Sequence, residues 1–221
     1  MLNITSPYPY KEFKRKSVGG KRLYENPYGD PVPSVTTILS KTKDMTHLNA
    51  WKKRVGEKKA QEIVTEAAGV GSIMHAMLEA WSLNQEYTGQ NMLQAKMMAE
   101  TVIKNVEADI DEVWGSEVNL CYPGLYAGTT DLVGIYKGRP TIMDFKQTNR
   151  PKKREWIDDY FMQAAAYGMA HNEVFGTKIE HTAIFMCSRD CDWQLWEAGP
   201  EEFKVWEEKW ANRVEEFYNL S

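Results

Sequence analysis

Two oppositely charged residues, Asp144 and Lys146, lie two positions apart in the apolar segment 141–146. On a strand, residues two apart project from the same face. A strand this apolar is expected to be buried, and a carboxylate and an ammonium are poor choices there unless they find a partner or a metal ion. The pair is therefore a candidate catalytic pair, and the alternative is an exposed ion pair on an edge strand.

A third charge, Asp131, comes from the preceding predicted strand. The Lys-Gly dipeptide at 137–138 is typical of a two-residue hairpin turn, which pairs Tyr136 with Arg139. Five positions further along each strand, Asp131 then lies opposite Asp144, with Cβ atoms about 4.5–5.5 Å apart. Two such carboxylates repel each other unless a cation lies between them, and their oxygens suit Mg²⁺ or Mn²⁺.

The facing-carboxylate arrangement also predicts stability. If Asp131 and Asp144 repel each other without metal, the metal-free Asp131→Asn variant should be at least as thermostable as the wild type. The alternative is that Asp131 belongs to a turn and plays no part in a site.

Hydrophobic periodicity and turn residues predict the elements around these charges. Ser34 is expected to cap a short helix, and Gly69 and Gly71 are expected to break a longer one. The predicted helices are 47–68, 72–84, 91–114, 156–175 and a last one from Pro200; the predicted strands are 117–122, 130–136, 141–146, 178–187 and 192–198.

This order predicts an α/β fold in which a small mixed central sheet is flanked by helices and the N-terminal half is helical. Residues 1–32 are expected to form an irregular arm or a short hairpin, and residues 33–221 a single domain.

Two further motifs surround the three charges. His75 ends the G-x-x-x-H pattern at 71–75, and Gln163 with Tyr167 gives Q-x-x-x-Y on the helix after the Lys146 strand. In this order the set resembles the PD-(D/E)XK nucleases, and specifically their RecB-type branch. Thr130 stands where that motif often has proline.

The resemblance covers roughly residues 32–218. Four segments resemble in particular the mitochondrial genome maintenance exonucleases and their phage relatives: 33–39, 51–54, 144–153 and 210–218.

The resemblance implies a fold with a PD-(D/E)XK nuclease core and a set of site residues. The implied ligands of one or two Mg²⁺ or Mn²⁺ ions are His75, Asp131, Asp144, the carbonyl of Phe145, and Glu117. Lys146 would orient the attacking water or stabilise charge on the phosphate, and Gln163 and Tyr167 would hydrogen-bond the catalytic region.

For several of these residues a purely structural role remains an alternative. The alternative for His75 is a hydrogen-bonded core histidine, for Tyr167 it is helix–sheet packing, and for Glu117 and Glu79 it is a plain surface acid.

DNA contacts are predicted from clustered charge. Sixteen of the 27 basic residues lie in three groups, which suits a positive cleft, although charge alone favours three solvated surfaces. The three groups contain residues 11–22, 52–59 and 146–154. We predict phosphate contacts from Lys53, Arg54, Thr148, Lys152, Lys153 and Arg154. At most one of four aromatic residues is expected to stack on unpaired bases: Trp51, Trp156, Tyr160 or Phe161.

The predicted function is a metal-dependent DNA exonuclease that hydrolyses phosphodiester bonds at the ends of single strands or single-stranded tails, in replication, recombination or repair. The single-strand preference comes from the resemblance alone. Partners are DNA and possible replication or recombination proteins. The alternatives are a duplex-end-resecting recombination exonuclease, a structure-specific endonuclease and, as a non-enzyme, a DNA-end binding module.

Composition limits the remaining possibilities. The 221 residues carry a net charge of −4 and no apolar run of the length that a membrane helix needs. The N-terminus has no apolar core typical of a signal peptide, and no transit peptide is recognised, so we expect a cytoplasmic protein of a bacterium or a phage-infected cell. Three cysteines predict neither a disulfide framework nor an iron–sulfur cluster: Cys121, Cys187 and Cys191.

Overall fold

The computed structural model describes residues 1–18 and 21–220, and says nothing of the side chains of Val18, Lys21 and Arg22. Lys21 and Arg22 belong to the first predicted basic group, so that part of the prediction lies outside what the structure describes. No helix in the described ranges is both long enough and apolar enough to span a bilayer.

A five-stranded mixed sheet forms the centre of the molecule, in the order β4-β5-β6-β7-β8. All neighbours pair antiparallel except β6 and β7, which are parallel. The strands are β4 (Ile110–Tyr122), β5 (Tyr126–Tyr136), β6 (Arg139–Thr148), β7 (Thr182–Ser188) and β8 (Trp193–Ala198).

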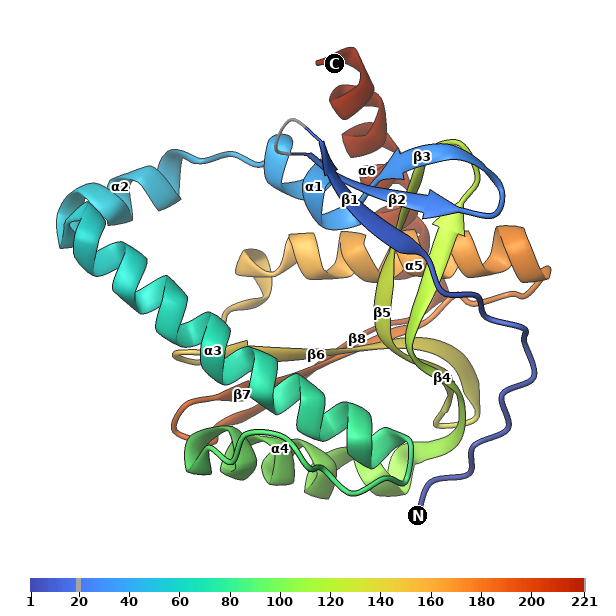
Figure 1. Ribbon diagram of the computed structural model, residues 1–221, viewed down its shortest axis with the longest axis horizontal. Helices are drawn as coiled ribbons and strands as arrows, with labels where there is room; N and C mark the ends of the chain where they lie inside the picture. The colour runs from blue at the N-terminus through green and yellow to red at the C-terminus, as the bar shows by residue number, and fades with distance from the viewer. Residues whose placement is uncertain (19–20, 221) are drawn as a thin grey trace.

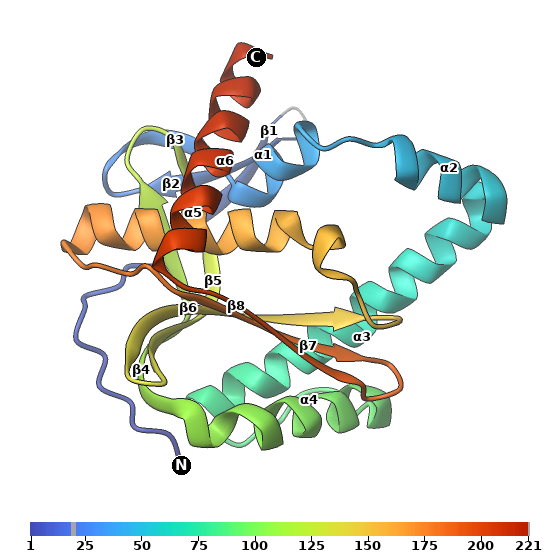
Figure 2. The ribbon, with the colours of Figure 1, turned by 180° about the vertical axis from the view of Figure 1, so that it is seen from behind.

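Helices cover both faces of this sheet (Figures 1 and 2). One hydrophobic cluster joins one sheet face to α1, α5 and α6, and a second joins the other face to α3 and α4. The helices are α1 (Val35–Lys41), α2 (Thr46–Val55), α3 (Glu57–Ser82), α4 (Leu93–Val106), α5 (Asp158–Phe175) and α6 (Pro200–Asn219). The predicted mixed sheet flanked by helices is confirmed.

The hairpin of β5 and β6 has the predicted turn and register. Lys137 and Gly138 both have positive φ, 49° and 73°, as a two-residue turn matched to strand twist requires. Tyr136 pairs with Arg139 as predicted, and the ladder ends at Leu132↔Met143. Beyond that pair the two strands no longer form ladder pairs, and Asp131 and Asp144 are the first residues past its end.

The predicted break at Gly69 and Gly71 is wrong. The helix α3 runs through both glycines, and the chain bends instead at Gly56, whose φ of 85° suits glycine. Each glycine costs a helix roughly 1 kcal/mol relative to alanine. Burial of Val70 and Met74 against the sheet and α4 outweighs that cost.

The predicted helix over 91–114 is too long at its C-terminal end. The helix α4 stops at Val106, a single 3-10 turn follows (Glu107–Asp109), and β4 begins at Ile110. Ile110 pairs with Tyr136 at the far end of the β5 strand, so sheet pairing decides this boundary. The predicted strand over 178–187 also begins later, at Thr182.

Residues 14–18 and 21–33 form more regular structure than the predicted arm or short hairpin. They make a three-stranded antiparallel sheet: β1 (Lys14–Val18), β2 (Lys21–Asn26) and β3 (Gly29–Pro33). Tyr24 and Val32 pack on Cys121 and Ala127 at the tip of the β4–β5 hairpin. The division into an arm over 1–32 and one domain over 33–221 stays a prediction.

The cap of the first helix follows the prediction. The Ser34 hydroxyl accepts a hydrogen bond from the N–H of Thr37 at 3.0 Å, and Val35, Ile38 and Leu39 of α1 are buried. This fixes where the chain leaves the N-terminal sheet.

Candidate active site

Asp131 lies where β5 and β6 separate. There its side-chain carboxylate, and not a backbone carbonyl of β5, accepts a hydrogen bond from the β6 backbone. Its Oδ2 accepts a hydrogen bond from the Phe145 N–H at 2.8 Å. Its Oδ1 lies 3.5 Å from Nδ1 of His75, which α3 supplies. The predicted cross-strand pair of Asp131 and Asp144 is therefore wrong, because the ladder ends one pair before them and each carboxylate has a different cationic partner.

Asp144 and Lys146 form a buried pair, as their spacing predicted. Lys146 Nζ lies 2.6 Å from Asp144 Oδ2, and Asp144 is only 2% exposed. This contact lacks the direction of a hydrogen bond, and the Oδ2 atom has no hydrogen-bond partner among the described groups. Lys146 donates instead to Gln163 Oε1 at 3.1 Å.

The Q-x-x-x-Y motif of α5 completes this chain of contacts. Gln163 Nε2 donates to the Tyr167 hydroxyl at 3.2 Å, so one turn of α5 connects a buried tyrosine to Lys146. The Tyr160 ring, one turn before Gln163, has its centroid 5.0 Å from Lys146 Nζ. Five residues thus form one connected group: Asp144, Lys146, Tyr160, Gln163 and Tyr167.

A second group brings together ligand atoms suited to a divalent metal. His75, Glu117 and Asp131 each offer one atom, and these atoms lie within 4.8 Å of one another. Glu117 lies between the ladder pairs Ser116↔Leu132 and Val118↔Thr130, which bracket Asp131 on the neighbouring strand. One imidazole and two carboxylates fit Mn²⁺, and the oxygens also fit Mg²⁺.

Glu117 reaches this group with an unusual backbone conformation. Its φ is 51°, a value that few non-glycine residues adopt. Strained backbone of this kind is concentrated at functional sites, where surrounding structure compensates for its cost. The conformation supports Glu117 as a site residue over the surface-acid reading.

Two of the carboxyl groups in the site have raised pKa values, and burial is the main cause in both. Burial, reinforced by Asp131, raises the pKa of Glu117 to about 7. Burial also raises the pKa of Asp144 to about 6, although Lys146 acts in the opposite direction. Carboxyl groups with raised pKa values in one small space are what a bound cation would relieve.

Asp131 behaves differently from the other two acids. Burial would raise its pKa, but His75, Lys146 and the Phe145 N–H together hold it below its ordinary value. The same contact acts on His75, where burial would lower the pKa and Asp131 raises it overall. Asp131 is thus the carboxylate that stays charged.

Phe145 shows which way the strand backbone faces. Because its N–H reaches Asp131, its carbonyl also points to the β5 side of β6, since both groups of one strand residue point to the same side. The side chain is buried in the core between the sheet and α3. This orientation is compatible with the predicted role of the carbonyl as a ligand.

An open cleft of about 650 Å³ lies over these groups. Its helical wall consists of small residues of α3 together with His75 and Glu79, and its other wall carries Glu117, Asp131, Lys146 and Gln147. Small side chains at Ala67, Ala68, Gly71, Ser72 and Ala76 leave this space open. The cleft therefore gives a substrate access to the His75–Glu117–Asp131 group and to Lys146.

Comparison with known proteins finds exonucleases that are similar in sequence. The chain is 26% identical over 172 residues to mitochondrial genome maintenance exonuclease 1 of Xenopus tropicalis, and 25% identical over 175 residues to the human protein of that name. The chain resembles the mitochondrial genome maintenance exonucleases. The match covers 72% of this chain in both cases but only 49% and 50% of the relatives, so the chain spans about half their length. No protein-family model matches the chain.

Two solved structures show a weaker likeness. One is a protein of Eubacterium rectale described as a candidate exonuclease, with a TM-score of 0.44, 13% identity and 68% of each chain covered. The other is SSO0001, with a TM-score of 0.41, 15% identity, and coverage of 78% of this chain and 69% of that one. At these values the likeness does not establish a shared fold.

The residues predicted to contact DNA lie in different environments. Lys53 and Arg54 are exposed on the last turn of α2, and Lys153 is exposed between β6 and α5. Lys152 is half-buried, with its backbone bonded to the side chain of Gln194.

Two of the six have structural partners instead. Thr148 is buried and donates to the Arg150 carbonyl at 2.7 Å. The Arg154 guanidinium pairs with Glu202 and lies 3.7 Å from the Phe161 ring centroid. Both residues have the contacts expected of structural groups, whereas Lys153 is exposed and lies 3.9 Å from the equally exposed Glu155.

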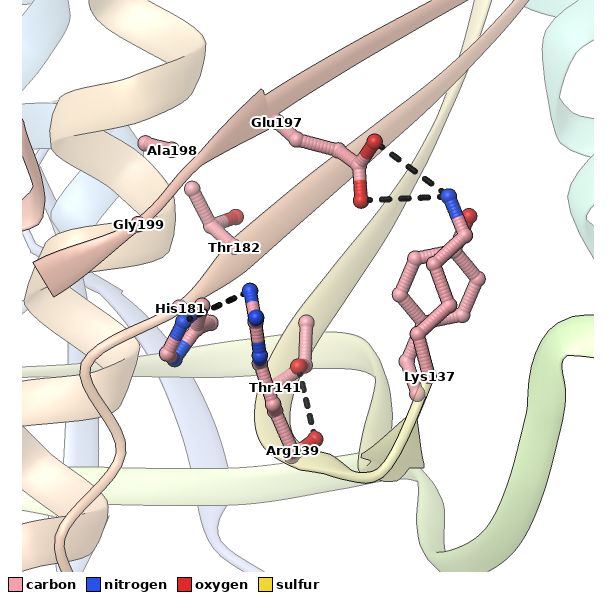
Figure 3. A pocket seen from close by; sticks show the side chains of 9 residues that line it. Lys137, Arg139, Thr141, His181, Thr182, Glu197, Ala198 and Gly199 are labelled. Carbon is pink, nitrogen blue, oxygen red and sulfur yellow. Dashed lines mark hydrogen bonds and ion pairs between the residues drawn. The ribbon is translucent and has the colours of Figure 1, made fainter.

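A second hollow, of about 220 Å³, lies at the other end of β6 (Figure 3). Arg139 and Lys146 are separated by about 23 Å of extended strand at roughly 3.3 Å per residue. There Lys137 is paired with Glu197 at 3.3 Å, and Arg139 lies 3.5 Å from His181 Nε2. None of the predicted site residues lines it, and its lysine charge is compensated.

Gly128 is a site-positioning residue that the sequence did not reveal. A Cβ at Gly128 would lie 2.7 Å from Cε1 and 2.9 Å from the hydroxyl of Tyr167, whose ring is buried. Only the approach of α5 to β5 creates this constraint, so no local sequence signal indicates it.

We expect Gly128→Ala to destabilise the protein by about 1–3 kcal/mol, because a rigid buried ring must move away from the new methyl group. Thermal unfolding measures the effect. Gly69→Ala is the matched control, because nothing lies within 4 Å of its added Cβ and helix propensity predicts a neutral or stabilising change. Equal melting of Gly128→Ala and wild type would show that Tyr167 is not held against β5.

Proposed function

We propose that this chain is a metal-dependent DNA exonuclease with a PD-(D/E)XK nuclease core, acting at the ends of single strands or single-stranded tails. The observation that supports it most is that His75, Glu117, Asp131 and Lys146 line one open cleft. Asp144 and Gln163 hold Lys146 from behind that lining. Five residues of the RecB-type pattern are thereby joined to Glu117, although they come from α3, β5, β6 and α5: His75, Asp131, Asp144, Lys146 and Gln163. The resemblance to exonucleases of known name supports the same proposal.

The donor set fits a divalent cation. His75, Glu117 and Asp131 would hold it, with Asp144 and the Phe145 carbonyl joining if Asp144 exchanges part of its contact with Lys146. A bound Mg²⁺ or Mn²⁺ would supply Lewis acidity to the phosphate under attack.

Charge stabilisation and positioning at the phosphate would come from side chains of this chain. Gln163 holds the Lys146 ammonium at 3.1 Å, and Asp144 holds it at 2.6 Å, so the positive charge has a fixed position beside the cleft. From there it would stabilise negative charge that develops on a phosphate. His75 keeps Asp131 ionised, and Asp131 keeps the separated strand ends together through Phe145.

A cleavage assay tests the proposal. Linear single-stranded DNA, the same strand circularised, and a blunt duplex are incubated with Mg²⁺, Mn²⁺ or a chelator. We expect metal-dependent loss of nucleotides from the linear strand while the circle survives, because an exonuclease needs an end.

Each rival predicts a different result in that assay. Nicking of circles supports a structure-specific endonuclease, and faster digestion of the blunt duplex supports an end-resecting recombination exonuclease. End binding without cleavage in either metal supports a DNA-end binding module and contradicts the enzyme.

A further inference from the structure

Four aromatic residues were candidates for stacking on unpaired bases, and the structure separates them. Phe161 is fully buried and stacks on Trp206 with ring centroids 5.2 Å apart. The Tyr160 ring is half-buried beside Lys146, and Trp51 is half-buried on α2. Trp156 is 60% exposed, and no other tryptophan, tyrosine or phenylalanine in the described part of the chain exceeds 41%.

The exposed ring of Trp156 projects from a segment that is firmly anchored. Trp156 ends a short 3-10 turn (Arg154–Trp156), and its N–H donates to the Lys153 carbonyl at 3.0 Å. Before it, the Arg154 guanidinium lies against the Phe161 ring and pairs with Glu202. After it, Ile157 is fully buried. The backbone on both sides is fixed by core contacts, and the indole is left outside.

A cation accompanies the ring. Lys153 Nζ lies 5.4 Å from the Trp156 ring centroid, and 66% of the Lys153 side chain is exposed. An aromatic face beside an exposed ammonium is the combination that binds a base and its phosphate in single-stranded nucleic acids.

The segment that carries this pair leads directly into the candidate site. It joins β6, which supplies Asp144 and Lys146, to α5, which supplies Gln163 and Tyr167. In both overall views it lies at the end of β6 that passes beside α3, on the side where α3 forms the helical wall of the cleft (Figures 1 and 2). Tyr160, four residues after Trp156, already contacts Lys146.

We infer that Trp156 is a stacking platform for an unpaired base of the substrate strand, with Lys153 contacting an adjacent phosphate. This inference rests on the proposed function. It names a residue that would make the protein prefer single strands over duplexes. Bases in a duplex are already stacked on both sides, so a protein ring cannot replace those contacts without opening the helix. A single strand offers free base faces to Trp156.

Binding in chelator separates stacking from charge. Trp156→Ala, Trp156→Phe and Lys153→Ala are compared on a single strand, on an abasic strand of the same length, and on a duplex. We expect Trp156→Ala to weaken binding to the single strand by roughly 5- to 100-fold. Trp156→Phe should retain most of the affinity, because it keeps a π face.

The abasic strand and the salt dependence identify the cause. Trp156→Ala should bind the abasic strand and the duplex as wild type does, and its slope of log affinity against log salt should be unchanged, because a neutral ring releases no counterions. Lys153→Ala should flatten that slope instead. Tyr218→Ala removes an exposed aromatic ring on α6 and should bind every ligand normally.

Two outcomes overturn the inference. Wild-type affinity of Trp156→Ala for the single strand excludes stacking, and an equal loss on the abasic strand shows that the ring acts only through backbone contacts or folding. If the wild-type protein still cleaves linear strands, either of these results for Trp156→Ala leaves the proposed function intact. A wild type that neither binds nor cleaves any of the DNAs rejects the proposed function itself.

Discussion

Replacing Lys146 with alanine is expected to lower the rate of strand cleavage by at least about 10²- to 10³-fold, the usual effect of removing one charge-stabilising group from an active site. Lys146 is the only residue that contacts both Asp144 and Gln163 among the described hydrogen bonds and ion pairs. Asp131→Asn and Asp144→Asn should also abolish cleavage, and all three variants should still bind DNA, because the exposed cations lie elsewhere.

The controls for this experiment address folding and charge. Lys178→Ala removes a lysine whose side chain is 82% exposed, so it should retain wild-type cleavage. Removing Lys146 leaves Asp144 buried without its cation, and breaking one partner of a buried pair can destabilise a protein by about 3–5 kcal/mol. Lys146→Met also leaves Asp144 without its cation but fills the cavity that alanine creates, so it should be equally inactive and melt above Lys146→Ala.

The rate is measured on end-labelled linear strands with saturating Mn²⁺, beside a thermal melt of each variant. Wild-type turnover by a folded Lys146→Ala protein would remove Lys146 from the catalytic site.

Manganese is expected to stabilise the wild type against heat, because a ligand that binds only the folded state stabilises it by about 2.7 kcal/mol at a concentration of 100 Kd. For a domain of this size that corresponds to a rise in Tm of about 5–10 °C. Asp131→Asn should gain much less, since it loses a ligand from the His75–Glu117–Asp131 group.

Without metal the structure reverses the expectation drawn from the sequence. The facing-carboxylate argument predicted that chelated Asp131→Asn would be at least as stable as wild type. The pKa of Asp131 is instead held below its ordinary value, against the effect of burial, by His75, Lys146 and the Phe145 N–H. The folded state therefore favours the charged form, and we expect chelated Asp131→Asn to melt below wild type.

The direction of the pH effect follows from the lowered pKa. Stability contributed by Asp131 is present above the unfolded pKa of about 3.9 and is lost as the pH falls towards the lower folded value.

Asp30→Asn, which removes an exposed aspartate from β3, is the matched control for the melts and should change neither the chelated Tm nor the response to Mn²⁺. Equal responses of wild type and Asp131→Asn to Mn²⁺ would contradict a metal site at Asp131.

Local sequence determined the hairpin that carries the central charges. The Lys-Gly turn takes positive φ at both positions, which fixes the register, and the two-residue period of a strand then places Asp144 and Lys146 on one face. The Q-x-x-x-Y spacing likewise placed Gln163 and Tyr167 in contact on one helix face. These relations depend on neighbours within a turn or along a strand, so the sequence was sufficient to predict them.

Contacts between distant segments decided the rest. The helix α3 continues through Gly69 and Gly71 because its buried face packs on the sheet and α4, and β4 begins at Ile110 because Tyr136 pairs with it. His75 reaches Asp131 across 56 positions of sequence, and Glu117 joins them through a backbone conformation that no local pattern indicated. The sequence could name the charged residues, but which charge pairs with which depends on burial and on where the strands separate, and those are properties of the packed structure.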